Sequence, residues 1–220
     1  MRQRKPNCAC IDPEKFCVLC HAIPPEGDNI AEMVKDYVEK KWKERLENRF
    51  DSLITFTDFI CGRPNKLQVS EVELPFQFCK DFHQFRMTAA TIKEAEKKLK
   101  KAGLDRLNTF EEVYKRVLQE TKDVKGFGIL AAYDFSIRYC WKRKLFPKRV
   151  YLQAGAYNGA KKLINAGYPV KIEKDENGIY TAELSSFPIE IMELRTVLAE
   201  DFLCIYKSRI ETLSKPNSNK

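Results

Sequence analysis

Residues 109–141, TFEEVYKRVLQETKDVKGFGILAAYDFSIRYCW, contain the strongest structural signal in this sequence. Thr109 and Glu112 form a Thr-x-x-Glu capping box, which predicts the start of a helix. Apolar residues then recur at helical spacing on both sides of a Gly-x-Gly segment at residues 126–128. This stretch therefore predicts two amphipathic helices joined by a tight glycine bend.

Helical patterns also occur on both sides of this pair. One helix is expected to begin at Asp28 or Asn29, a second to be capped by Thr91, and others to follow Pro188. Residues 169–184 instead alternate apolar and polar side chains around an Asn-Gly pair, which is a strong β-hairpin signal. We therefore expect a mainly α (α+β) fold, a multi-helix domain with one small β-hairpin.

Composition divides the chain into three parts. Residues 1–27 form a Cys-rich and Pro-rich head without helical or strand periodicity, residues 28–213 form the helical domain, and residues 214–220 form a polar tail. Apolar residues make up 44% of the chain, which is enough for a core. No apolar run approaches the roughly 18 residues that span a bilayer, and no apolar signal segment begins the chain. We therefore expect a soluble, cytoplasmic protein that makes no membrane contact.

The positive charge of the chain is concentrated in one segment. The net charge is +8, yet residues 135–172 contain no Asp or Glu and nine Lys or Arg. Outside these nine, 30 basic and 31 acidic residues nearly cancel. A local excess of cations attracts polyanions, which points to nucleic acid, either DNA or RNA. The nine cations are Arg138, Lys142, Arg143, Lys144, Lys148, Arg149, Lys161, Lys162 and Lys171.

Residues 108–141 resemble the helix-hairpin-helix motif. In that family an apolar residue precedes Gly-apolar-Gly, and a small residue follows four positions after the second glycine. Val124, Gly126, Phe127, Gly128 and Ala132 occupy these places. The resemblance implies that amides of the bend bind a backbone phosphate without reading sequence. The predicted nucleic-acid-binding residues are Lys125, Gly126, Gly128, Ile129, Arg138, Lys142, Arg143, Lys144, Lys148, Arg149, Lys161 and Lys162.

A second phosphate site is suggested further along the chain. Residues 148–156 open the next predicted helix, where Gly155 and Ala156 would place helix N-terminal amides beside Lys161 and Lys162. Together with the glycine bend, this segment resembles more weakly a family of uncharacterised bacterial proteins, which implies no activity. An ordinary helix–helix turn without a ligand, and a plain loop with a helix start, remain open as alternatives at the two places.

The Cys-rich head offers up to five soft metal ligands: Cys8, Cys10, Cys17, Cys20 and His21. Tetrahedral Zn²⁺ needs four, and a Cys-x-x-Cys pair is a normal half-site. We predict a structural zinc on the four cysteines, with His21 able to replace one, because such a metal orders a segment too short for its own core. A flexible, oxidisable leader and an iron–sulfur cluster are the alternatives. The other four cysteines are expected to be small buried side chains: Cys61, Cys79, Cys140 and Cys204.

The sequence does not settle whether the protein is an enzyme. Glycosylases of the helix-hairpin-helix class carry a catalytic Asp well downstream of the bend, whereas here the first acid after Asp134 is Glu173, which disfavours that chemistry. Carboxylates for two-metal catalysis could come from Asp51, Asp58, Asp81 and Glu94. The first function expected is a nucleic-acid-binding module with little sequence preference. The alternatives are a metal-dependent nuclease or other nucleic-acid enzyme, and then a protein-interaction subunit of a larger complex.

Overall fold

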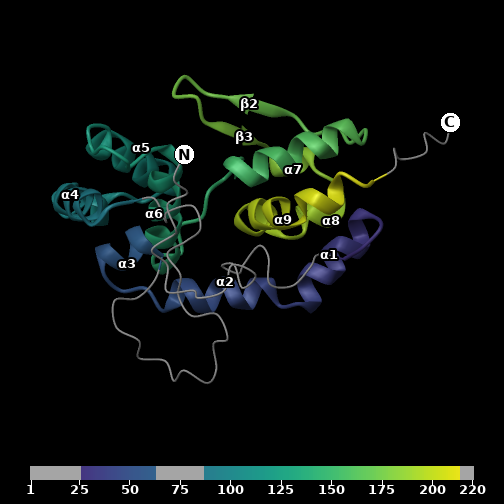
Figure 1. Ribbon diagram of the computed structural model, residues 1–220, viewed down its shortest axis with the longest axis horizontal. Coiled ribbons are helices and arrows are strands. Elements are labelled where there is room, and N and C mark those ends of the chain that lie inside the picture. The colour runs from purple at the N-terminus through teal and green to yellow at the C-terminus, as the bar shows by residue number, and fades with distance from the viewer. Residues whose placement is uncertain (1–25, 63–86, 214–220) are drawn as a thin grey trace, which may run out of the picture. The chain divides into compact units, whose positions relative to one another are not determined.

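The computed structural model describes residues 26–62 and 87–213. These residues are mainly helical with a small antiparallel sheet, as the sequence predicts (Figure 1). They fall into two compact units: a first unit of residues 47–62 and 87–145, and a second unit of residues 26–46 and 146–213. The helical domain predicted for residues 28–213 thus corresponds to two units, and the boundary falls once inside helix α2 (Trp42–Asp51).

The first unit is a set of helices around one core. Its elements are the C-terminal part of α2, α3 (Phe56–Cys61), α4 (Ala89–Leu99), the 3₁₀ helix η2 (Leu104–Arg106), α5 (Phe110–Thr121) and α6 (Ile129–Lys142). Helix α3 contacts α4, α4 contacts α5, α5 contacts α6, and α6 returns to α3. Phe59 and Phe135 from this ring of contacts meet edge to face, with ring centroids 6.2 Å apart.

One of the two predicted N-caps in the first unit is confirmed, and the other lies three residues earlier than predicted. The Thr109 hydroxyl accepts a hydrogen bond from the amide of Glu112 at 3.2 Å, and the Glu112 carboxylate accepts one from the Thr109 amide at 3.0 Å, so the predicted capping box is present. Helix α4 begins earlier than predicted. Its N-cap is Thr88, whose hydroxyl accepts from the Thr91 amide at 3.2 Å, while Thr91 itself is buried inside the helix.

The second unit is built around helix α9. Its elements are α1 (Ile30–Glu39), the N-terminal part of α2, β1 (Val150–Tyr151), α7 (Ala154–Asn165), β2 (Ile172–Lys174), β3 (Tyr180–Ala182), η3 (Leu184–Ser186), α8 (Ile189–Met192) and α9 (Arg195–Ile210). Residues 202–206 of α9 are all buried, because α1, α7, α8 and β1 cover this helix.

None of the described helices is both long enough and apolar enough to cross a membrane.

The predicted β-hairpin is present and gains a third strand. The sheet is antiparallel in the order β1-β3-β2, and Ile172 of β2 pairs with Ala182 of β3. Asn177 and Gly178 form the turn, where Gly178 takes a left-handed φ of +81°. Val150 of β1 pairs with the other edge of Ala182. A two-residue strand is too short to show alternation, so its pairing could not be predicted.

Small residues on α7 let α9 approach closely, and the two helices lie side by side in Figure 1. A Cβ on Gly159 would lie 2.4 Å from the carbonyl oxygen of Leu203, and a Cβ on Gly155 would lie 2.5 Å from the Cys204 sulfur. Ala156 is fully buried. The expectation that Ala156 presents its amide to an anion is corrected, since this amide donates to the carbonyl oxygen of Gln153 at 2.8 Å.

The described cysteines match their expected role as buried side chains. Cys61, Cys140 and Cys204 are buried, whereas Cys79 lies outside the described residues. Burial raises the pKa of the Cys140 thiol to about 12, so the thiol stays protonated at neutral pH.

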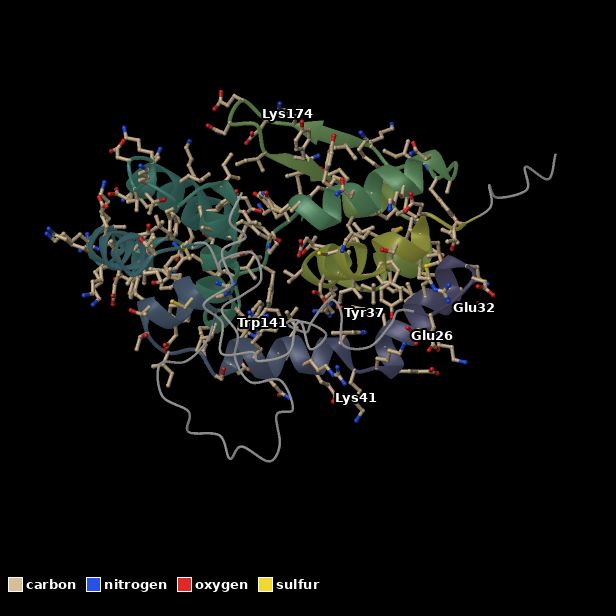
Figure 2. All side chains as sticks on the ribbon, viewed as in Figure 1. Glu26, Glu32, Tyr37, Lys41, Trp141 and Lys174 are labelled. Carbon is tan, nitrogen blue, oxygen red and sulfur yellow. The ribbon has the colours of Figure 1, made fainter. Side chains whose placement is uncertain are left out.

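Two tyrosine–aspartate pairs join α1 to α9. The Tyr37 hydroxyl, seen between these helices in Figure 2, donates to Asp201 at 2.8 Å, and the Tyr206 hydroxyl donates to Asp36 at 2.6 Å. Lys40 lies 2.8 Å from the Asp36 carboxylate. Burial raises the pKa of Tyr37 well above its ordinary value, and the charge of Asp201 adds to this. Burial also acts to raise the pKa of Asp36, but hydrogen bonds from Lys40 and Tyr206 outweigh it and lower that pKa.

The lowered pKa of Asp36 should make the α1–α9 contact sensitive to acid. A carboxyl whose pKa is lower in the folded state stabilises the fold above its unfolded pKa, about 3.9 for Asp, and this stability is lost as pH falls through the folded value. We expect the wild-type protein to be more stable than Asp36→Asn near neutral pH, and the difference to shrink as the pH drops. Denaturant titrations of both proteins, from neutral pH into acid, measure this difference in the free energy of unfolding. A difference that stays constant into strong acid would contradict the assignment.

Candidate nucleic-acid interface

Residues 122–128 join α5 to α6 and form the glycine bend, called the bend below. Gly126 has a φ of +88°, a left-handed conformation that side chains other than glycine rarely adopt. Gly128 is extended, with φ −91° and ψ −172°, and is the N-cap of α6. Among residues 26–62 and 87–213, a Cβ on Gly128 would meet no heavy atom within 4 Å beyond its chain neighbours. The space in front of Gly128 is therefore open.

Apolar side chains fix the inner side of the bend. Val124 and Phe127 are 3% and 5% exposed, and Ala132 on the first turns of α6 is completely buried. The Tyr114 hydroxyl of α5 donates to the carbonyl oxygen of Ile129 at 3.4 Å. Because the apolar residues point inward, the two glycines and the polar backbone of the bend are left on its outer side.

Helix α4 supports the bend from its flank. The Thr91 hydroxyl donates to the carbonyl oxygen of Lys125 at 2.9 Å, and a Cβ on Gly126 would lie 3.3 Å from the same hydroxyl. Two turns further along α4, Lys98 lies 3.9 Å from the carboxylate of Asp123. The bend and one side of α4 therefore form one packed block within the first unit.

The amides at the start of α6 lack acceptors in the part of the chain that the structure describes. Within the described part of the chain, the amides of Gly128 and residues 129–131 have no acceptor, and the first bond of the helix runs from the Ala132 amide to the Gly128 carbonyl at 3.0 Å. Such amides carry partial positive charge and favour an anion. Lys122 and Lys125 have exposed side chains in the same segment.

Arg138 does not belong to an exposed cationic surface. It is 2% exposed, and its guanidinium donates to the carbonyl oxygens of Phe59 at 2.9 Å and Ile60 at 3.2 Å, at the C-terminal end of α3. The carboxylate of Asp134 lies 3.8 Å away. This corrects the expectation that Arg138 contacts phosphate, because its charge instead stabilises the negative end of a helix.

The next three cations lie at the far end of α6. The helix has 14 residues and is therefore about 21 Å long. Arg143 donates to three carbonyl oxygens of residues 104–107 at 2.6 to 3.0 Å, and Lys142 donates to the carbonyl oxygen of Asp51. Lys144 is exposed. These side chains start at the opposite end of the helix from the bend and do not extend its surface.

The remaining predicted cations belong to the second unit. Two of them are ion-paired: Arg149 with Glu173 at 2.7 Å and Glu183 at 3.2 Å, and Lys162 with Glu211 at 2.5 Å. Two others have exposed side chains: Lys148 and Lys161. The cations of residues 135–172 are thus divided between two units, and several are already used by the fold.

Helix α4 and the turn that follows it contain a row of lysines that the overall charge pattern did not reveal. Lys93 and Lys97 of the helix and Lys101 of the turn are spaced four residues apart, have exposed side chains, and form no ion pair among the described residues. Their neighbours Lys98 and Lys100 do form ion pairs, at 3.9 and 3.0 Å. The run KKLKK at residues 97–101 is the sequence signal for this lysine row, but two nearby glutamates hide it in a local charge count.

The charge of the described chain is also divided unequally. The first unit contains 15 Lys and Arg against 11 Asp and Glu, an excess of four positive charges. The second unit contains 14 against 15, an excess of one negative charge. Any long-range attraction for a polyanion therefore arises mainly from the unit that contains the bend.

The residues considered for metal binding are only partly described. Across residues 26–62 and 87–213, no three His, Cys, Asp or Glu side chains are grouped so that they could hold a metal. The Asp58 carboxylate caps α3, accepting from the amides of Ile54 at 3.2 Å and Thr55 at 2.8 Å. The zinc site of the head stays a prediction, because its candidate ligands lie outside the described residues: Cys8, Cys10, Cys17, Cys20 and His21. Asp81, a candidate carboxylate for two-metal catalysis, also lies outside them.

No protein-family model, curated protein or solved structure matches this chain. The resemblance of residues 108–141 to the helix-hairpin-helix motif therefore stays a prediction.

Proposed function

We propose that this protein binds the phosphate backbone of nucleic acid at the bend, with little preference for sequence. The observation that supports this most directly is the open space in front of Gly128, beside amides that have no acceptor within the described chain. Backbone amides at a helix start recognise phosphate oxygens and make no contact with base edges. Lys122 and Lys125 add exposed positive charge to the same segment.

Energetics favour a polymer of phosphates over a single small anion. An exposed anion at a helix N-terminus gains only about 0.3–1 kcal/mol from the helix dipole. A useful affinity therefore needs several such contacts, together with the release of counterions from a highly charged ligand. The positive excess of the first unit acts in the same direction, because it draws a polyanion towards the bend.

Gly128→Ala tests this function with little disturbance of the fold. The backbone of Gly128 is extended and accessible to any residue, and the added methyl group meets no described atom within 4 Å, so the expected loss of stability is only the cost of alanine at an N-cap, roughly 1 kcal/mol. The methyl group would, however, stand where a phosphate approaches the amides. We expect about two- to fivefold weaker binding to a fluorescein-labelled oligonucleotide, measured by anisotropy, since the contact with the helix start is worth about 0.3–1 kcal/mol.

The same titrations at two salt concentrations provide the control for an electrostatic mechanism. Wild-type binding should weaken steeply as salt rises, because phosphate contacts release counterions. Gly126→Ala is unsuitable as the test variant, since a φ of +88° strains alanine whether or not a ligand binds. Binding that ignores salt and is unchanged in a correctly folded Gly128→Ala protein would rule out the bend as the site.

A further inference from the structure

We infer that the second unit contains its own site for single-stranded nucleic acid, at which an unpaired base stacks on Tyr157 or Tyr180 and the neighbouring phosphates bind Lys161 and Lys174. These four residues are called the tyrosine–lysine site below. The inference goes beyond the proposed function, because it names a form of nucleic acid and a second place of contact. It uses no residue of the bend, so each site can fail without the other.

The two tyrosines lie where α7 meets the β-hairpin. Tyr157 of α7 and Tyr180 of β3 have ring centroids 4.5 Å apart, with their ring planes tilted by 39°. Both side chains are half-buried, and neither hydroxyl has a hydrogen bond within the described part of the chain. The pair therefore offers aromatic surface and two polar groups that the fold does not use.

One lysine lies over each ring. The Lys161 ammonium is 5.5 Å from the centroid of the Tyr157 ring, one helical turn earlier on α7, and the Lys174 ammonium is 5.3 Å from that of Tyr180. Lys174 is directly opposite Tyr180 in the pairing of β2 with β3, and Figure 2 labels it on the hairpin. Both lysines are exposed, and neither forms an ion pair among residues 26–62 and 87–213. Two positive charges thus lie beside the aromatic pair.

Most acids of the hairpin are engaged by other groups. Glu173 precedes Lys174 on β2, so its side chain points to the opposite face of the sheet, where its carboxylate lies 2.7 Å from Arg149. The Asp175 carboxylate accepts hydrogen bonds from two amides of the turn, at 2.9 and 2.8 Å. Glu176 is exposed on the turn and offsets part of the positive charge. The side that carries the tyrosines therefore keeps a local positive excess, although the second unit as a whole is slightly negative.

The size of the two competing contacts favours a base over the ammonium that now lies on each ring. An ammonium over an exposed aromatic ring shifts an equilibrium by about two- to fivefold, whereas a base stacked on an aromatic side chain strengthens binding by about five- to 150-fold. A base can therefore replace a lysine over its ring, and the flexible lysine can then reach the adjacent phosphate. Bases inside a duplex already stack on each other, so only a single strand offers a free base face.

Two substitutions of Tyr157 separate the loss of stacking from the loss of the hydroxyl. Tyr157→Leu removes the ring from a helix in which leucine is a good helix former, and Tyr157→Phe keeps the ring as the matched control. With labelled single-stranded oligonucleotides, Tyr157→Leu should bind about five- to tenfold more weakly, and Tyr157→Phe within about twofold of the wild type. Duplex binding should stay within about twofold of the wild type for both. Circular dichroism and melting temperatures check that each variant is folded.

Removal of the two lysines should instead change the salt dependence. Lys161→Gln with Lys174→Gln should reduce the slope of log affinity against log salt by roughly 1.4, or about 0.7 for each lost contact with a single strand. Lys93→Gln with Lys115→Gln removes the same charge from two exposed lysines of the first unit, and should change this slope by less than half as much. Tyr157→Leu should leave the slope unchanged, because stacking releases no counterion.

Crosslinking of the wild-type protein gives a measurement that depends on no variant. A single strand containing photoreactive bromouracil should crosslink to Tyr157 or Tyr180, as mapped by mass spectrometry. Crosslinks confined to other residues, or an equal loss of single-strand and duplex binding in Tyr157→Leu, would overturn the tyrosine–lysine site.

The outcomes for the tyrosine–lysine site and for the bend can be told apart. If Gly128→Ala weakens binding and Tyr157→Leu does not, the bend stands and the tyrosine–lysine site is overturned. The reverse result supports the tyrosine–lysine site and overturns the bend. A wild-type protein that binds duplexes but no single strand also overturns the tyrosine–lysine site, and one that binds no oligonucleotide overturns both.

Discussion

Replacing Arg138 with methionine should lower the free energy of unfolding of the first unit by about 3–5 kcal/mol. The guanidinium satisfies the carbonyl oxygens of Phe59 and Ile60, which face the end of α3 and have no further residue of that helix to donate to them. Methionine fills similar volume but donates no hydrogen bond. Two polar atoms would then lose their partner, and the Asp134 carboxylate would lose a nearby positive charge.

The two tryptophans allow this loss to be measured in the correct unit. Trp141 lies in the first unit and Trp42 in the second, so a Trp42→Phe background leaves Trp141 as the reporter in denaturant titrations. Arg106→Met in the same background is the matched control, because Arg106 is exposed and should change stability by no more than about 0.5 kcal/mol. Equal stabilities of the two variants would show that the buried contacts of Arg138 contribute little.

The same residue shows what the sequence could predict and what it could not. The helix that contains Arg138 follows from local signals, a capping box before α5 and a glycine bend before α6, which act within a few residues. The burial of Arg138 depends on a carbonyl oxygen 79 residues away. No periodicity within α6 reports that distant contact, so a charge count assigned the side chain to the surface.

Several cations of the basic segment, residues 135–172, are used by the fold for a related reason. Ion pairs such as those of Arg149 with Glu173 and Glu183 join residues that the sequence places far apart. Conversely, the lysine row of residues 93–101 was hidden because Glu94 and Glu96 lower the local net charge, although of these two acids only Glu96 is paired with a lysine among the described residues. A charge count along the sequence therefore overestimates the exposed positive charge where the fold pairs cations with distant acids. It underestimates that charge where nearby acids do not pair with the cations.

Gly159→Leu should destabilise the second unit by at least about 3 kcal/mol, because any side chain at this position must push α7 away from α9. The first carbon alone would lie 2.4 Å from the carbonyl oxygen of Leu203 and 3.0 Å from its carbonyl carbon. These are backbone atoms inside α9 and cannot rotate aside as a side chain does. Helices that pack through small residues separate when those residues grow, and the buried contacts around Leu203 would loosen together.

Gly159→Ala tests whether steric overlap with α9 is the cause, because helix propensity and overlap act in opposite directions at this position. Gly→Ala inside a helix ordinarily stabilises by about 0.5–1 kcal/mol, whereas the steric overlap at Gly159 costs about 1–3 kcal/mol. Asn158 is exposed on the same helix, so Asn158→Ala shows the propensity gain without the overlap. We expect Asn158→Ala to raise the melting temperature slightly and Gly159→Ala to lower it. A stabilised Gly159→Ala protein would mean that α7 and α9 are not held as closely as the positions of Gly159 and Leu203 require.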